Sequence, residues 1–341
     1  MKAGHPLLSR RAALASLGTV GMTGVALRQV VASDADDGPR ALYHALASQP
    51  AERIDVGGAT VSLVFADDAP GLNRAAVRDW ISLAASAIAA YFGRFPIRTY
   101  GVLVIATDGA RIAQATTFGF NGPATSIHVG RDADEPVFHN DWILVHEMMH
   151  AVSPDLPRRA LWLQEGSATW LEPVARAQVG NLPISDVWTQ AVRGMPKGEP
   201  EADEAGLDGT DRWGRLYWGG ATFWLEAEIA IWVQSGGRKS LIDAMRAIAQ
   251  PGGGNAVIWS PERWMRVGDA ACAVNALLPL YQRYASKRVA PDLPALFDRL
   301  GVSRSVDGTV VLDPHAELAA LTTRITQRQA PARQPITSKE T

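Results

Sequence analysis

The chain has almost no cysteine. Cys272 is the single cysteine among 341 residues, so no disulfide can form within this sequence. A metal site built from several thiolates is excluded for the same reason, and any metal must be held by histidine and carboxylate side chains. An excess of one charge is also missing, since 33 Lys and Arg face 35 Asp and Glu and the formal net charge is -2. Nothing in this balance indicates nucleic acid as a partner.

Long hydrophobic runs are equally scarce. The run at 12–27 follows Ser9-Arg10-Arg11, is closed by Arg28, and is too short for a comfortable membrane span. Small residues at 30–32 suit a signal peptidase, so we predict that residues 1–32 are a signal peptide and that the chain is exported to the periplasm or secreted. The paired arginines favour the twin-arginine route, and an ordinary Sec signal that carries two arginines is the alternative.

No span is expected in the mature chain. The apolar run at 221–233 contains Glu226 and Glu228, which indicates a buried helix. No cysteine follows the signal, so we expect no lipid anchor.

The remaining sequence changes character near residue 145, from β-rich to helical. Alternating or β-branched stretches predict a strand pair or one bent strand at 54–65, a central strand at 100–106, and a turn with an exposed edge strand within 116–130. Helical spacing appears at 73–92, 141–152 and 161–175 and again from 216 onward. This order predicts an α+β fold, with a sheet followed by a mainly helical lobe.

The motif HEMMH at 146–150 carries the strongest chemical signal. Residues four apart lie on one face of a helix, so His146 and His150 can bind one ion. Glu147 lies beside that line and can reach a water held by the metal. Zinc acidifies such a water, and a carboxylate can take its proton. The motif therefore predicts one zinc ion, with Glu147 as general base.

A third ligand is expected on the next helix. Glu165 lies in WLQEGSATWLE (162–172), and two helices joined by the turn at 154–159 can bring it against the histidines. Two histidines and one glutamate leave a fourth position open, as a catalytic zinc requires. Glu172 is a rival ligand. We expect instead that Glu172 and Thr169 orient a ligand histidine through its other ring nitrogen, with a solvated charge at the helix end as the alternative for Glu172.

HEMMH followed by LWLQEGSATWLE resembles the gluzincin zinc metallopeptidases, most closely the peptidase MA-like group. It is also similar to the aminopeptidase N and glycyl aminopeptidase families. The likeness is specific over about residues 139–173. It implies a zincin-type mixed sheet with active-site helices, and we expect the helices to pack on one face of that sheet. Tyr217 in YWGGA (217–221) fits the family's Tyr-x-x-Gly-Ala segment, which implies that it donates a hydrogen bond to the oxyanion; a buried tyrosine at a helix start is the alternative.

Composition and periodicity, together with the resemblance, suggest how the chain is divided. We expect the zincin-type sheet and active-site helices at 40–175, a lid or long loop with a short helix near Val187 at 176–214, a helical lobe at 215–328 and a disordered tail at 329–341.

One departure concerns the substrate amine. Aminopeptidases of this kind carry an acidic segment that binds the free amino terminus, but the corresponding stretch GFNGPATSIHVG (119–130) contains no acid. An acid from elsewhere, such as Asp134, Glu135 or one within 200–212, is the alternative anchor. His128 and His139 are expected to be structural or exposed.

The function predicted from these observations is zinc-dependent hydrolysis of a peptide or protein substrate. Two alternatives stay open: an exported protein that binds zinc without catalysis, and a zinc hydrolase that acts on a non-peptide bond.

Overall fold

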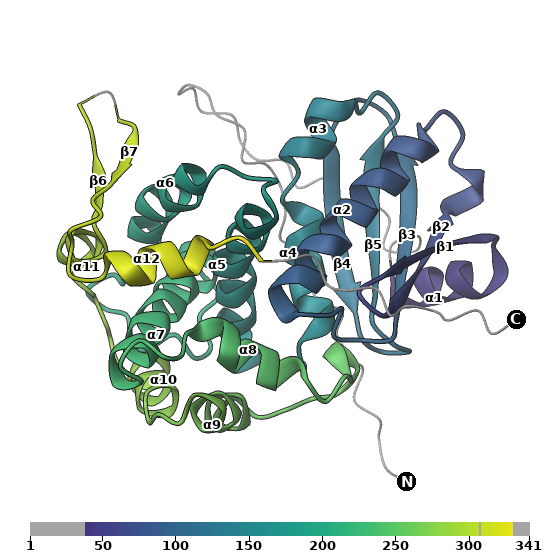
Figure 1. The fold of residues 1–341 in the computed structure, drawn as a ribbon. Helices are drawn as coiled ribbons and strands as arrows, with labels where there is room; N and C mark the ends of the chain where they lie inside the picture. Colours follow the sequence, from purple (N-terminus) through teal and green to yellow (C-terminus); the bar gives the residue numbers. More distant parts are fainter. Residues whose placement is uncertain (1–37, 307, 330–341) are drawn as a thin grey trace, which may run out of the picture.

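The computed structural model describes residues 38–306 and 308–329 (Figure 1). The predicted signal peptide at 1–32 lies outside these residues, as does the predicted tail except for Gln329. The Gln329 amide donates to the carbonyl of Gln178 at 3.1 Å.

A five-stranded mixed sheet forms the first half of the chain. Its strand order is β1-β2-β3-β5-β4, with β2, β3 and β5 parallel and both outer strands antiparallel to their neighbours. The bounds are β1 (Ala51–Val56), β2 (Ala59–Phe65), β3 (Thr99–Thr107), β4 (Ile112–Phe118) and β5 (Ala124–Gly130). The hairpin of β1 and β2 and the central position of β3 agree with the sequence expectations.

The edge strand is not the one that the sequence indicated. The strand expected at an exposed edge is β5, which lies inside the sheet between β3 and β4. The edge is formed by β4, most of which precedes the predicted stretch. Its alternation is broken at Gln114, where a bulge with φ 35° shifts the pairing with β5, so periodicity alone did not reveal a strand there.

Helices cover both faces of the sheet. The helix α1 (Pro39–Ser48) was not expected; it packs on one face, where Leu42 and Ala45 contact Val64 and Leu103. The opposite face carries the main core and the long helix α2 (Arg74–Phe92). This helix starts where the Asn73 side chain accepts from the amide of Ala76, and it ends at Gly93 with φ 80°. The expectation that helices cover one face only was therefore wrong.

The active-site helices stand between the sheet and the helical lobe (Figure 1). After α3 (Glu135–Asn140), α4 (Ile143–Val152) packs along β4, and α5 (Leu161–Val179) packs against α4, α2 and α7. The helical lobe then contains α6 (Ile184–Gly194), α7 (Gly220–Gln234), α8 (Leu241–Ala249), α9 (Pro261–Cys272), α10 (Leu277–Ser286), α11 (Leu293–Leu300), the strand pair β6 (Val302–Arg304) and β7 (Val310–Leu312), and α12 (Ala319–Thr326).

The segment expected as a lid or long loop, 176–214, has more regular structure than its composition indicates. Its first residues complete α5, and α6 is an amphipathic helix whose Trp188 is fully buried. A 3-10 turn, Met195–Gly198, extends it. The irregular part is 199–212. None of the described helices combines the length and apolarity needed to cross a bilayer.

Candidate metal centre

The start of α4 is fixed by a carboxylate. The two side-chain oxygens of Asp141 accept from the amides of Ile143 and Leu144, both at 3.1 Å. This satisfies two backbone donors that have no partner within the helix. Burial raises the pKa of Asp141 to about 6, although these two amides and Arg176 act in the opposite direction. One turn further along, α4 presents the two histidines of the motif.

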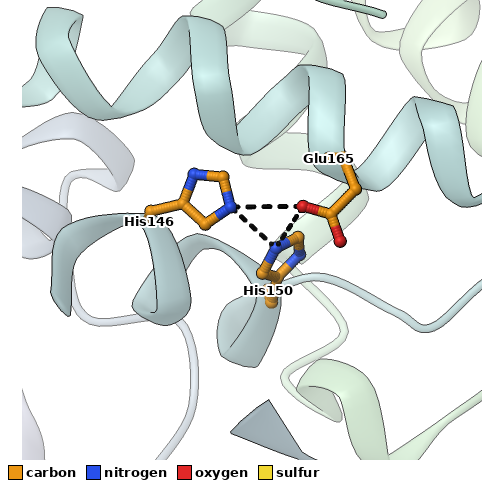
Figure 2. A group of neighbouring side chains, drawn as sticks. All are labelled: His146, His150 and Glu165. Carbon is orange, nitrogen blue, oxygen red and sulfur yellow. Dashed lines mark hydrogen bonds and ion pairs between the residues drawn. The ribbon is translucent and has the colours of Figure 1, made fainter. Parts of the chain in front are cut away.

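His146, His150 and Glu165 converge on one point (Figure 2). The Nε2 atoms of the two histidines lie 3.2 Å apart, and Oε2 of Glu165 lies 3.3 Å from Nε2 of His146 and 3.4 Å from Nε2 of His150. Both imidazoles are buried and come from α4, while the carboxylate comes from α5. The three ligand atoms therefore form a nearly equilateral triangle.

The size of this triangle fits zinc. Ligands at ~2.0–2.1 Å from a tetrahedral zinc are about 3.3 Å apart, which is the edge length found here. Two imidazole nitrogens that face each other at 3.2 Å also need a cation or a proton between them. Burial acts to raise the pKa of Glu165, but His150 and His146 outweigh it and hold this pKa well below its usual range. The carboxylate is thus ionised and suited to a metal.

Glu147 is buried beside the triangle, with 5% of its surface exposed. Its carbonyl accepts a hydrogen bond from the Thr117 hydroxyl at 3.2 Å, which ties α4 to the edge strand β4. Glu147 also contributes to the raised pKa of Tyr217, so this carboxylate and this phenol interact electrostatically.

Tyr217 lies against the metal centre. Its ring stacks on His146 with centroids 5.9 Å apart and on Trp213 at 5.4 Å. Burial, followed by the charges of Glu165 and Glu147, raises its pKa far above the usual value, so the phenol keeps its proton. Tyr217 lies in a π-helical turn, Arg215–Gly219, that leads into α7. Such turns are rare and often occur at functional sites.

Two glycines bring the third ligand and the tyrosine together, a feature that the sequence analysis missed. The helices α5 and α7 cross at Gly166 and Gly220, each next to a residue or turn of the site. A Cβ on Gly166 would lie 2.3 Å from the carbonyl carbon of Gly220, and one on Gly220 would lie 2.2 Å from the carbonyl oxygen of Trp162. In the sequence, this close helix crossing could have been inferred from the glycine that follows Glu165 and from the Gly-Gly pair after Trp218.

The expected support for a ligand histidine is arranged differently. Glu172 does not contact His146; its Oε1 accepts from Nη1 of Arg176 at 2.8 Å. The two residues are four apart on α5 and both buried, so the guanidinium takes the carboxylate as its counter-ion. Burial raises the pKa of Glu172 to about 7 although Arg176 opposes this. Nδ1 of His146 and the hydroxyl of Thr169 have no hydrogen-bond partner in the described chain.

The other candidate residues lie outside the triangle. His139 lies in the last turn of α3, and its carbonyl accepts from Nη2 of Arg176 at 3.1 Å. His128 lies on β5. Asp134 caps α3 by accepting from the amide of Val137, and Glu135 is exposed on the same helix. In the 200–212 loop, Glu204 pairs with Arg215 at 3.1 Å.

A cavity of about 400 Å³ opens beside His146 and Tyr217. Aromatic side chains form one wall: Trp142, Trp213, Tyr217 and Trp218. A polar face of α6 and the turn after it forms another wall, next to Trp218, and α5 contributes Thr169, Glu172 and Arg176. Trp162 and Trp170, on α5, are buried and do not line this cavity.

The fold and the site together define a class: an α+β protein with a His-His-Glu cluster, its two histidines buried, on helices between the sheet and the helical lobe. The chain has the fold of an aminopeptidase N family protein from Idiomarina loihiensis, with a TM-score of 0.56 and 12% identity. The alignment covers 74% of this chain and 49% of that protein, so the chain spans about half of its length. An M1 zinc metallopeptidase from Deinococcus radiodurans is also similar, with a TM-score of 0.45 and 17% identity over 72% of this chain and 52% of that one. No protein-family model and no curated protein sequence matches the chain.

Proposed function

We propose that the chain is a zinc-dependent peptidase in which His146, His150 and Glu165 hold the metal. The observation that carries this proposal is the triangle of ligand atoms with edges of 3.2–3.4 Å, which has a buried carboxylate and a buried phenol at its side. When bound, zinc supplies Lewis acidity toward water and toward a carbonyl oxygen.

Two side chains beside the triangle then have separate roles in the reaction. Glu147 takes the proton of the attacking water and passes it to the leaving amine. Tyr217 stays neutral and donates a hydrogen bond to the developing oxyanion, which a high pKa permits. The edge strand β4, tied to α4 through Thr117, offers its outer side for pairing with an extended peptide.

The test combines metal content with cleavage. The purified protein is stripped with a chelator, reloaded with zinc, and assayed on an internally quenched peptide library while bound zinc is measured by mass spectrometry. We expect one zinc per chain and cleavage that returns only with metal. Glu147→Gln should keep the zinc and lose cleavage, whereas Glu317→Gln, an exposed control outside the cavity, should keep both. Zinc binding by the wild type without cleavage of any peptide would contradict the proposal.

A further inference from the structure

The cavity beside the metal centre has an uneven distribution of charge. The helix α6 and the turn after it line it with Asp186, Gln190, Arg193 and Lys197, whose spacing of three or four residues places them on one helical face. Arg176 also lines the cavity, but Glu172 compensates its charge at 2.8 Å. Within the described part of the chain, Arg193 and Lys197 form no ion pair.

Arg193 and Lys197 lie at the same end of the cavity as Tyr217. Gly194, next to Arg193, packs so closely that a Cβ there would lie 2.2 Å from the Trp218 ring. Gly198, next to Lys197, packs on the backbone just after Trp218: a Cβ on Gly198 would lie 2.1 Å from the amide nitrogen of Gly219. Arg193 and Lys197 are exposed while they line the cavity, so their side chains stand at its opening.

Acidic groups are further away along the same wall. Asp186 precedes Arg193 by seven residues, which is about 10 Å along the helix axis. Its carboxylate accepts a hydrogen bond from the Ser185 hydroxyl at 3.4 Å. At the opening of the cavity, a substrate group therefore meets two cations that form no ion pair, together with aromatic surface, while the carboxylates near Tyr217, Glu165 and Glu147, belong to the metal centre.

We infer that this cavity recognises a carboxylate of the peptide substrate through Arg193 and Lys197, with the aromatic wall holding the adjoining apolar atoms. This inference rests on the proposed function and names the substrate class of that site. A carboxylate that reaches both cations forms charge-assisted hydrogen bonds at a partly exposed position. The carboxylate comes either from an acidic side chain or from the peptide's carboxyl terminus, which have the same recognition chemistry.

The experiment measures binding, so that it does not depend on turnover. Zinc-loaded Glu147→Gln protein is titrated with two matched peptide pairs, and the dissociation constants are compared. One pair exchanges Glu for Gln in a peptide with an amidated end; the other pair has neutral side chains and a free or an amidated end. We expect a preference of about 5- to 20-fold for the carboxylate in at least one pair, decreasing as salt is added.

A second set of variants assigns the preference to residues. Adding Arg193→Gln and Lys197→Gln should bring the preference ratio close to one. Adding Arg266→Gln and Lys287→Gln, two exposed cations outside the cavity, should leave the ratio as it was. A ratio near one in both pairs before these changes, or a ratio that survives the cavity variant, would overturn the inference. Failure of the proposed function is distinguishable, because it appears as zinc-loaded wild type that cleaves no peptide at all.

Discussion

The crossing of α5 and α7 offers a test of how the site is assembled. In Gly220→Ala, the new methyl group would lie 2.2 Å from the Trp162 carbonyl oxygen and 2.7 Å from Cα of Gly166. The two helices must separate by about 1 Å to restore van der Waals contact. Such overpacking costs about 1–3 kcal/mol of stability, of which the better helix propensity of alanine returns up to about 1 kcal/mol.

The separation should affect catalysis more than folding. Glu165 precedes the crossing on α5, and Tyr217 precedes it in the π-helical turn that leads into α7, so the displacement moves one relative to the other. A misplacement of about 1 Å can lower the rate by about 10²-fold. We expect that Gly220→Ala keeps the fold, loses a few degrees of Tm, and loses kcat by this factor.

The assay is steady-state cleavage of a quenched peptide, together with thermal unfolding and zinc content. Gly219→Ala is the matched control, because its Cβ would have 3.2 Å to the nearest atom, the Gly198 carbonyl oxygen. If Gly220→Ala lost no more activity than Gly219→Ala, the close crossing would not be what positions the tyrosine.

Three further predictions concern the reacting groups. Glu147→Gln should retain zinc, since the ligands are untouched, and lose turnover; full activity would mean that another residue is the base. Tyr217→Phe should lower kcat by about 10²–10³ with little change in KM, as measured beside Tyr281→Phe from the helical lobe, and an unchanged kcat would leave Tyr217 a packing residue. Peptides with an acetylated amino terminus should be cleaved at least as fast as free ones, because the 119–130 segment has no acid and a buried ammonium needs a counter-charge; strict dependence on the free amine would indicate a substitute anchor such as Asp186.

Local sequence was sufficient for the parts of the site that depend on helix periodicity. His146 and His150 are one turn apart on α4, so their convergence followed from spacing alone. Glu165 followed from the short connection between α4 and α5. The strands with continuous β-branched runs were recognisable for a related reason, since burial on both faces leaves a distinct pattern.

What could not be predicted depends on tertiary packing. The edge strand β4 is interrupted by its bulge at Gln114, and α1 is short, with only Leu42 and Ala45 fully buried. Glu172 was expected to orient a ligand histidine. It pairs instead with Arg176, one turn away, because this guanidinium is buried and requires a counter-ion, and the sequence does not show that Arg176 is buried. A short helix was expected near Val187, where α6 lies, but its role as a cavity wall depends on the packing of Gly194 against Trp218, which the sequence does not show.

The π-helical turn has a consequence for changes in chain length. A π turn holds one more residue than an α-helical turn. Loss of one residue between Tyr217 and Gly220 would let the turn close as regular α-helix, and Tyr217 would rotate by about 100° around the axis of α7. The phenol would then leave the side that stacks on His146, while the helix would gain regular hydrogen bonds. At this one position, a more regular helix and an assembled site exclude each other, so a shortened chain can be well folded and still lack the tyrosine where the reaction needs it.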